Sequence, residues 1–525
     1  MLTMFQTFLL INKKTMQEPI ISYAGRLIRK NELKRDVEVM MKALIILGLK
    51  PGELLMLHMP LIPEGIVLTF AANALGIRVA YANYEGPEEE LREEVVRYSA
   101  KVVARYYEAY GDEPAKIHFE SGPVNIYLAE YKNLYHLAVT AYVDPRLMRL
   151  KTVFTRAPMI FLQTSGSTAV RPKGLPFSNW NIFWSLVYAA KSTGTTTHST
   201  EVKKALCVLN FRHPYGWMPL FVNVMGGNRV ELAAGATPEH IAKWYLSEPS
   251  YIYGTPQFLR EFIARTPADA DLSFLRAFFC AGDSTEEELF AEFAEFCRQH
   301  NASQAEIRNN YGAGELLCVG TTSDGIPHRP GASGKFYSGP GLEWLIVDED
   351  LNPVPPGVSG EIIVHSRTMI KEYYQNPEET AKVFRQINGK TYYLTGDYAS
   401  LDADGYVYIL GRKKRFYQPR GATDKVNCET IEHALLAAHD LVADAGVVIY
   451  YLPDKSKSSC AYVVPAPGVA PSADTRQQIM AFLGARLRPF QLPTALEFLD
   501  TLPMLGSGKV NYPELERLCR SQYPS

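Results

Sequence analysis

Segments with strand character alternate with segments with helix character along this chain, and that alternation constrains the fold most. Residues 34–48 repeat apolar side chains at helical spacing, residues 54–62 form an apolar run typical of a buried strand, and residues 65–77 read as another helix. The same alternation returns at residues 204–211, 229–248 and 250–264. It predicts an α/β fold whose doubly wound sheets are mainly parallel.

The rest of the chain has a different pattern of apolar segments and turns. From about residue 330 to 411, short apolar segments are separated by Gly/Pro turns, which predicts a small β-rich subdomain. Beyond it come a helix, two strands and a helix, enough for a small α+β domain. Because 525 residues exceed what one core usually organises, we predict an N-terminal domain over residues 1–411 and a C-terminal domain over residues 412–525.

Charge and cysteine content exclude several classes of protein. The 54 basic and 56 acidic residues nearly balance, which argues against a nucleic-acid binder and favours small molecules or another protein as partners. Seven scattered cysteines without a CxxC pair favour a reducing, cytoplasmic compartment over a disulfide framework or a zinc site. No stretch reaches the roughly 20 apolar residues that a membrane helix needs, and the oligomeric state stays open.

The most informative motif is FLQTSGSTAVRPKG, residues 161–174, where an apolar strand runs into small hydroxyl and glycine residues. Backbone N–H groups and hydroxyls of such a loop can surround phosphate oxygens while a lysine supplies positive charge. It is not a Walker A loop, because Lys173 follows Pro172 and precedes Gly174. A flexible surface turn is the alternative. The candidate phosphate-binding residues are Thr164, Ser165, Gly166, Ser167, Thr168 and Lys173.

Four further motifs follow in order: NNYGAGE at residues 309–315, YLTGD ending at Asp397, LGRKKR with Arg412, and LPMLGSGKVN with Lys509. With the serine-rich loop they resemble the acyl-adenylate-forming (AMP-binding) superfamily of acyl-CoA synthetases, peptide-synthetase adenylation domains and luciferases. The resemblance extends from about residue 20 to 515. Singly, TGD would more often be an ordinary turn and Lys509 a surface lysine, but five motifs in the family's order argue against coincidence.

The resemblance assigns roles around a nucleotide. It implies that Tyr311 stacks on adenine and that Asn310, before it, hydrogen-bonds the base, with Gly312 completing the motif. Glu315 is the implied holder of Mg²⁺ and therefore a catalytic residue.

Asp397 and Arg412 resemble the family's ribose clamp, because a carboxylate can accept from two vicinal hydroxyls and a guanidinium adds donors. Lys509 is implied as the catalytic lysine, whose ammonium would hold the acid's carboxylate against the α-phosphate and offset charge in the transition state.

The implied reaction uses ATP and Mg²⁺ to convert a carboxylic acid into an acyl-adenylate, so that AMP replaces oxide as the leaving group. In the resembled family, the C-terminal domain then swings about a charged residue, here Lys414. That swing withdraws Lys509 and admits a thiol, either CoA or the phosphopantetheine of a separate carrier protein.

The acyl pocket is expected around the segment LNFRHPYGW, residues 209–217. His213 and Gly216 match the HxxG pattern of the acyl- and aryl-CoA branch. Trp217 and Gly282 are expected to line the same pocket, although an aromatic residue such as Trp217 could equally belong to the core. No acidic residue lies between Val208 and Gly227, so an amino group would lack a counter-charge, and we predict an acid without an α-amino group. A packed core histidine is the alternative for His213, which is otherwise a catalytic candidate.

Four departures from the family pattern accompany the match. Ala169 stands where the loop usually has glycine, in a loop that is one residue longer, and Gly314 replaces the threonine of YGxTE. Loss of one such hydrogen bond costs about 1 kcal/mol, which slows a reaction several-fold. Residues 419–427 look two residues longer than the family's segment near the thiol acceptor, and the N-terminal region looks shorter.

Other interpretations remain open at this stage. One is a stand-alone amino-acid adenylation enzyme, which pyrophosphate exchange with amino and non-amino acids would distinguish. Another is a non-catalytic homologue that binds a nucleotide or acyl ligand, which Ala169 and Gly314 favour and the retained charged residues oppose. A luciferase-like oxidation is conceivable on this fold, although nothing in the sequence singles it out.

Overall fold

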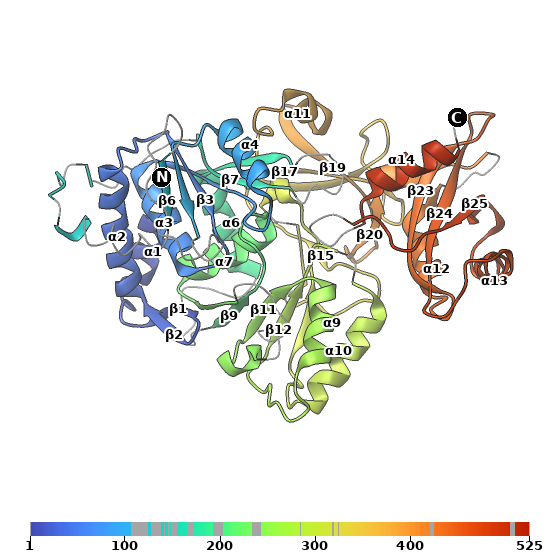
Figure 1. Ribbon diagram of the computed structural model, residues 1–525, viewed down its shortest axis with the longest axis horizontal. Coiled ribbons are helices and arrows are strands. Elements are labelled where there is room, and N and C mark those ends of the chain that lie inside the picture. The colour runs from blue at the N-terminus through green and yellow to red at the C-terminus, as the bar shows by residue number, and fades with distance from the viewer. Residues whose placement is uncertain are drawn as a thin grey trace.

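The structure is a computed structural model, and its helices and strands are labelled in Figure 1. It describes residues 2–106, 124–127, 138–140, 142–144, 147–148, 156–164, 172–192, 203–233, 243–283, 285–317, 320–323, 325–420, 425–504 and 510–523. Within these ranges, no helix combines the length and the apolar content that crossing a membrane would require.

A six-stranded sheet organises the first part of the chain. Its strand order is β6-β5-β3-β4-β7-β8, and every pair is parallel except β7 with β8. The strands are β3 (Leu54–His58), β4 (Arg78–Tyr81), β5 (Val102–Arg105), β6 (Val124–Tyr127), β7 (Pro158–Gln163) and β8 (Gly174–Ser178). β3 is buried along its whole length, as is typical of a parallel strand covered on both faces.

A seven-stranded sheet lies below the first one in Figure 1, in the order β13-β12-β11-β9-β10-β1-β2. Only the pair β1–β2 is antiparallel. The strands are β1 (Pro19–Tyr23), β2 (Arg26–Arg29), β9 (Lys204–Cys207), β10 (Arg229–Leu232), β11 (Tyr251–Gly254), β12 (Ala277–Cys280) and β13 (Glu306–Asn309). The carboxyl ends of β11, β12 and β13 therefore open at one edge, where open α/β sheets bind ligands.

Helices fill the space between the two sheets. α3 (Pro63–Leu75) and α7 (Pro214–Gly226) are buried on nearly every side, and one hydrophobic cluster joins them to residues of both sheets. Each begins with proline at its first position and ends at a glycine in the left-handed conformation, Gly76 or Gly227.

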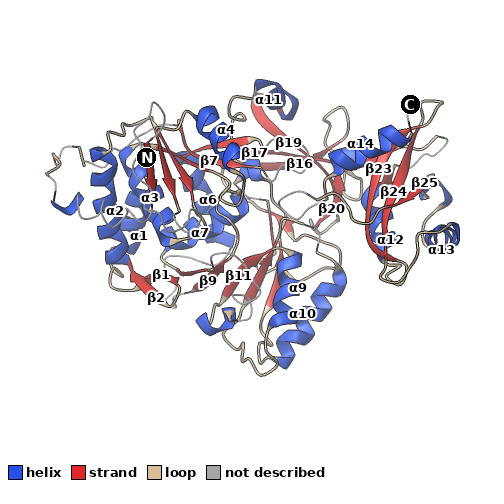
Figure 2. Ribbon diagram, viewed as in Figure 1, coloured by secondary structure: helices blue, strands red, loops and turns tan. Residues whose placement is uncertain are grey.

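The other helices either pack against α3 and α7 or cover faces of the sheets (Figure 2). They are α1 (Met4–Asn12), α2 (Lys30–Ile46), α4 (Glu88–Tyr98), α6 (Asn179–Ser192), α9 (Pro256–Arg265) and α10 (Glu287–Gln299), with 3₁₀ turns η2 (Trp244–Ser247) and η3 (Gly314–Leu316). α9 and α10 lie side by side on one face of the second sheet (Figure 1).

An antiparallel β-rich part follows. Strands β16-β17-β19-β18 form one sheet, and β20 pairs with β19. The elements are β14 (Thr321–Thr322), β15 (Lys335–Phe336), β16 (Leu342–Val347), β17 (Gly360–Ser366), α11 (Pro377–Val383), β18 (Phe384–Ile387), β19 (Lys390–Leu401) and β20 (Val407–Arg412).

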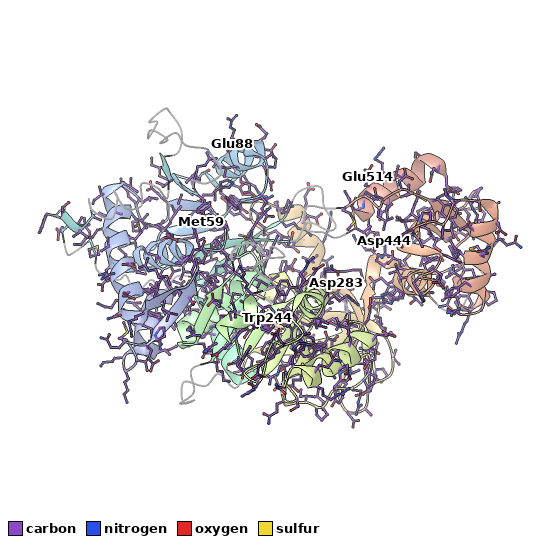
Figure 3. The ribbon with its side chains drawn as sticks, turned by 60° about the horizontal axis from the view of Figure 1, so that its bottom comes forward. Met59, Glu88, Trp244, Asp283, Asp444 and Glu514 are labelled. Atoms are coloured by element: carbon purple, nitrogen blue, oxygen red, sulfur yellow. The ribbon has the colours of Figure 1, made fainter. Side chains whose placement is uncertain are left out.

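The C-terminal domain has its own three-stranded sheet, β23-β24-β25, and its own apolar cluster. Its elements are η4 (Lys413–Arg415), β21 (Phe416–Tyr417), β22 (Val426–Asn427), α12 (Cys428–Leu436), β23 (Val442–Tyr451), β24 (Lys457–Pro465), α13 (Ala473–Gly484), η5 (Pro489–Gln491), β25 (Ala495–Phe498) and α14 (Tyr512–Gln522). Figure 3 shows Asp444 and Glu514 of this domain on the side away from Met59, which follows β3.

This architecture confirms the predicted α/β class with its β-rich part and its small C-terminal domain. The boundary between residues 411 and 412 stays a prediction, as does the hinge at Lys414. Lys414 is exposed and lies in η4, the 3₁₀ turn that directly follows β20.

Candidate active site

A pocket lies at the carboxyl edge of the second sheet, with about 880 Å³ of empty space that is partly open to solvent. One side is formed by α6 and α7, and the other by the ends of β11, β12 and β13. The lining residues are Ser185, Tyr188, Ala189, Tyr215, Met218, Pro219, Val222, Asn223, Tyr253, Phe279, Ala281, Gly282, Asn310, Tyr311, Gly312, Thr321 and Tyr337. Its lining of aromatic and small apolar residues, with a few neutral polar groups, is typical of small-molecule sites.

Three residues of the predicted adenine site lie in this wall: Asn310, Tyr311 and Gly312. The Oδ1 atom of Asn310 accepts a hydrogen bond of 3.1 Å from the Ser323 hydroxyl. No described residue accepts from its Nδ2 group, so that group can donate into the pocket. The backbone N–H of Tyr311 donates to the Thr321 hydroxyl at 2.7 Å, which fixes this turn beside the pocket.

Tyr311 is tied to the predicted ribose clamp. Its hydroxyl donates to Oδ2 of Asp397 at 2.6 Å, and Oδ1 of Asp397 pairs with Nε of Arg412 at 2.9 Å. Asp397 and Arg412 face each other because β19 and β20 pair in that register. Burial raises the pKa of the Asp397 carboxyl, while the charge of Arg412 and the Tyr311 hydroxyl act to lower it. The structure thus brings three sequence-predicted residues together.

Glu315, in η3, is buried, with 8% of its surface exposed. The Tyr373 hydroxyl donates to its Oε1 atom at 2.6 Å, and no described lysine or arginine forms an ion pair with it. A buried carboxylate without a cationic partner is costly, so a bound cation would stabilise it.

The donors around Glu315 fit a magnesium ion. Among the described residues, no group of three or more His, Cys, Asp or Glu side chains could hold a metal by itself. Mg²⁺ in nucleotide enzymes typically takes one or two carboxylates and completes its shell with phosphate oxygens and water, so Oε2 of Glu315 would suffice as the protein ligand.

Thr164 and Lys173 close the neck of the serine-rich loop. The backbone N–H of Thr164 donates to the Lys173 carbonyl at 3.1 Å, and the N–H of Lys173 donates to the Thr164 hydroxyl at 3.0 Å. The other predicted residues of the loop lie outside the described residues, and so does the predicted catalytic lysine. They are Ser165, Gly166, Ser167, Thr168 and Lys509.

Tyr373 links the loop lysine to the acidic residue. The Nζ atom of Lys173 lies 4.5 Å from the centre of the Tyr373 ring, whose hydroxyl holds Glu315. Lys173 also pairs with Oε2 of Glu379 at 3.2 Å, and Lys382 donates to the other carboxylate oxygen of Glu379 at 2.5 Å. Sequence reasoning missed Tyr373 and Glu379. The segment Asn-Pro-Glu-Glu does signal the start of α11, with Asn376 as N-cap, but not its contact with a loop 206 residues away.

Replacing Glu379 with glutamine should lower the KM for ATP by about threefold, because a carboxylate that neutralises Lys173 competes with phosphate and repels it. The measurement is the ATP dependence of pyrophosphate exchange. Glu378→Gln is the matched control, because Glu378 is exposed and carries the same charge in the same helical turn. An unchanged or higher KM in Glu379→Gln would contradict this competition.

His213 lies at the start of α7 and faces the strand that carries the phosphate loop. Its Nδ1 lies 3.1 Å from the Gln163 carbonyl, which can only accept, so Nδ1 carries the proton. Arg212, before it, donates from Nε and Nη2 to Oε1 of Gln163 at 2.9 and 2.6 Å. Nη2 also lies 3.2 Å from Glu90 and 3.7 Å from Glu94. Sequence reasoning missed this network, because its members come from three separate segments.

The structure brings together only part of the predicted acyl pocket. Gly282 lies in the wall with φ of +89°, a backbone conformation that favours glycine. Gly216 instead allows close packing, because a Cβ there would lie 2.1 Å from the Asn210 carbonyl oxygen. The expectation that Trp217 lines the pocket is wrong. Trp217 is 1% exposed, does not line the pocket, and donates from Nε1 to the Tyr81 hydroxyl at 2.9 Å in the core. His213 is not among the residues that form the wall.

Gly314 occupies a crowded place. A Cβ on this residue would lie 3.3 Å from Cδ1 of Leu175 and 3.4 Å from Cγ of Pro214. The threonine expected from the resembled motif would therefore require its neighbours to shift, which gives a packing reason for the glycine.

Comparisons with known proteins agree with this geometry. A family model described as "AMP-binding enzyme" matches residues 12–374, and a model described as "AMP-binding enzyme C-terminal domain" matches residues 430–509. Pyochelin synthase PchD of Pseudomonas aeruginosa is 30% identical over 365 residues, which make up 68% of this chain and 63% of that protein. The chain therefore spans less than two thirds of that relative's length.

Two further matches extend over more of the chain. Acetyl-coenzyme A synthetase of Pyrobaculum aerophilum is 24% identical over 502 residues, with 88% of this chain and 72% of that protein covered. The crystal structure of ATP-bound MatB from Rhodopseudomonas palustris has the same fold, with a TM-score of 0.82, 22% identity and 99% of both chains covered.

Proposed function

Because the chain belongs to the AMP-binding enzyme family, we propose that it activates a carboxylic acid with ATP as an acyl-adenylate and then transfers the acyl group to a thiol. One observation carries this proposal. A single pocket extends from Asn310 and Tyr311 to an aromatic and apolar wall on α7 and β11. At the first end, the Tyr311 hydroxyl donates a hydrogen bond to Asp397. A nucleotide and an acid bound side by side in such a pocket would have their reacting groups adjacent.

The nucleotide end offers matching groups. Nδ2 of Asn310 can donate to a ring nitrogen of adenine, and the flat face of Tyr311 can stack on the base. The two carboxylate oxygens of Asp397 have about four acceptor positions, of which Tyr311 and Arg412 use two, so two remain for ribose hydroxyls.

The phosphate end would be organised by Lys173, Thr164 and the loop residues Ser165, Gly166, Ser167 and Thr168. Glu315 would hold Mg²⁺, which when bound neutralises phosphate charge and stabilises the leaving pyrophosphate. In the first step, a carboxylate oxygen of the acid attacks the α-phosphorus and the bond to pyrophosphate breaks. Lys509, from the family resemblance, would hold the attacking carboxylate and offset the growing charge.

In the second step, the thiol loses its proton to water and its sulfur attacks the acyl carbon, and the carbon–oxygen bond to AMP breaks. We propose CoA or a carrier protein's phosphopantetheine as the acceptor. The names of the relatives, acetyl-coenzyme A synthetase and pyochelin synthase, are compatible with both. A swing of residues 412–525 about Lys414 would exchange the adenylating state for the thiol-accepting one.

The pocket wall opposes the alternative of an amino-acid substrate. Among its described residues, none is Asp or Glu, so the ammonium of an amino acid would be buried without a counter-charge. The six described cysteines are all buried and none forms a disulfide, which supports the proposal of a cytoplasmic location.

We expect ATP–pyrophosphate exchange with acids that lack an α-amino group, and an acyl-adenylate detectable by mass after incubation with ATP and Mg²⁺. A panel of fatty, aryl, dicarboxylic and amino acids would be compared at equal concentration. Exchange only with amino acids would replace the proposal by an amino-acid adenylation enzyme. Absence of any adenylate across the panel would instead favour a non-catalytic nucleotide-binding homologue.

A further inference from the structure

The described wall of the acyl pocket contains no charged side chain. It is built from five aromatic residues together with small, apolar and neutral polar ones. The aromatic residues, apart from Tyr311 at the nucleotide end, are Tyr188, Tyr215, Tyr253, Phe279 and Tyr337. A second carboxylate or an amino group on the acid would lose its hydration there without gaining a partner. The wall therefore selects an acid whose far part is neutral and flat enough to lie between aromatic rings.

Two routes along the backbone put roughly 10 to 12 Å between the two ends of this wall. Tyr253 pairs with Phe279 across β11 and β12, and Gly282 follows Phe279 by three residues, which is at most about 10 Å along the chain. Tyr215 packs beside Gly282, where a Cβ would lie 3.8 Å from its ring, and eight residues of α7 separate Tyr215 from Asn223, or about 12 Å. Tyr253 and Asn223 therefore lie at the end away from Gly282 and the nucleotide.

The hydroxyl oxygen of Tyr253 accepts a hydrogen bond from Asn223, and its proton is not donated to any described residue. Its ring stacks on Phe279, with centroids 4.7 Å apart and 10° between the planes, and the side chain is 8% exposed. Nδ2 of Asn223 donates to the Tyr253 oxygen at 3.3 Å and to the Pro219 carbonyl at 2.8 Å, while its Oδ1 accepts from Asn228 at 2.9 Å.

The direction of the Tyr253 proton follows from this arrangement. Because an amide N–H can only donate, Tyr253 must use its own proton elsewhere, and no described residue accepts it. A buried O–H donor without an acceptor costs free energy, which a ligand acceptor would recover. The residue lines the pocket, so the acceptor is expected on the bound acid.

We propose that the acid is an aryl carboxylic acid that carries an uncharged oxygen at the far side of its ring, and that this oxygen accepts the Tyr253 hydrogen bond. The inference rests on the proposed function and specifies its substrate. A ring with a short spacer to the carboxylate, as in a cinnamic acid, would span the pocket from Gly282 to Tyr253. Tyr253 is then a specificity-determining residue, and Asn223 orients it.

The test compares 4-methoxycinnamic acid with 4-ethylcinnamic acid in ATP–pyrophosphate exchange. The two acids have nearly the same size and differ in the oxygen that would accept the hydrogen bond. We expect the wild-type protein to favour the methoxy acid about five- to tenfold in kcat/KM, which is the effect of one hydrogen bond. Tyr253→Phe should abolish this preference. Tyr188→Phe, which removes another wall hydroxyl that already donates to the Pro340 carbonyl, should retain it.

The preference of the wild-type protein tests the proposal even if Tyr253→Phe does not fold. Equal kcat/KM for the two acids, or a preference that survives Tyr253→Phe, would overturn it. Adenylation of dicarboxylic or amino acids in place of these aryl acids would also overturn it, while the adenylation function would stand. If no acid of any class forms an adenylate, the proposed function itself fails.

Discussion

Glu315→Gln should lower the rate of acyl-adenylate formation by about a hundredfold or more without unfolding the protein. Glutamine keeps the size of the side chain and its carbonyl can still accept from Tyr373, so the packing of η3 is preserved. The negative charge that would hold Mg²⁺ is lost, and metal stabilisation of phosphate charge is worth several kcal/mol. The measurements are single-turnover adenylation at rising Mg²⁺ and a thermal melt of each protein.

Tyr373→Phe distinguishes the effect of the Glu315 charge from the effect of the position of its carboxylate. It leaves the Glu315 carboxylate in place but removes its hydrogen bond, so we expect a loss of about tenfold and a modest rise in the Mg²⁺ requirement. If Glu315→Gln shows the same Mg²⁺ dependence as the wild-type protein, Glu315 is not the metal ligand. If it melts well below Tyr373→Phe, the loss of activity is structural.

Arg212→Met should destabilise the folded protein by about 3 to 5 kcal/mol. Arg212 is buried beside Glu90 and Glu94, and methionine would leave the buried carboxylate of Glu94 without a cation. Arg260→Met is the control, because its partner Glu286 is half-exposed and such surface pairs contribute less than about 1 kcal/mol. Denaturant unfolding of both variants provides the comparison.

The defect of Arg212→Met should depend on pH. Burial already raises the pKa of Glu94, and Arg212 acts to lower it, so removal of Arg212 should raise that pKa further. A carboxyl whose folded pKa lies above its unfolded value loses stability as pH rises between the two values. The defect should therefore be smaller near pH 5 than near pH 8.

A second substitution identifies the cause of this defect. Glu94→Gln removes the buried charge that has lost its cation. The double variant Arg212→Met/Glu94→Gln should therefore recover most of the lost stability, with a coupling of about 2 kcal/mol or more in a double-mutant cycle. Additive effects of the two substitutions would show that the charge of Glu94 is not responsible. Because Arg212 also holds Gln163 next to the phosphate loop, we expect adenylation to slow even where the variant is folded.

The fold was accessible from sequence because its signals are local. Alternating strand and helix segments predicted the parallel sheets, and α3 and α7 carry proline and glycine at their ends. The motif residues Tyr311, Asp397 and Arg412 were found because they stand in recognisable short patterns, and the structure brings them into contact.

The missed residues have no such local signal. Tyr373 contacts Glu315 across 58 residues, and Glu379 contacts Lys173 across 206 residues, so no spacing rule relates them. Trp217 was expected in the pocket lining, with core packing as the alternative, and the structure shows the alternative because an aromatic side chain suits either place. Helical geometry separates the faces: residues 215, 218 and 222 line the pocket, whereas Trp217 and Phe221 stack in the core.

Helix α7 has two roles in this fold. One face forms a wall of the acyl pocket, and the opposite face packs in the core between the two sheets. Substitutions at Met218, Val222 or Asn223 that aim to change substrate choice would therefore risk disturbing the packing between the two sheets. Ala281 lies beyond the end of β12, outside that junction, and offers a safer starting point for directed evolution of new acid preferences.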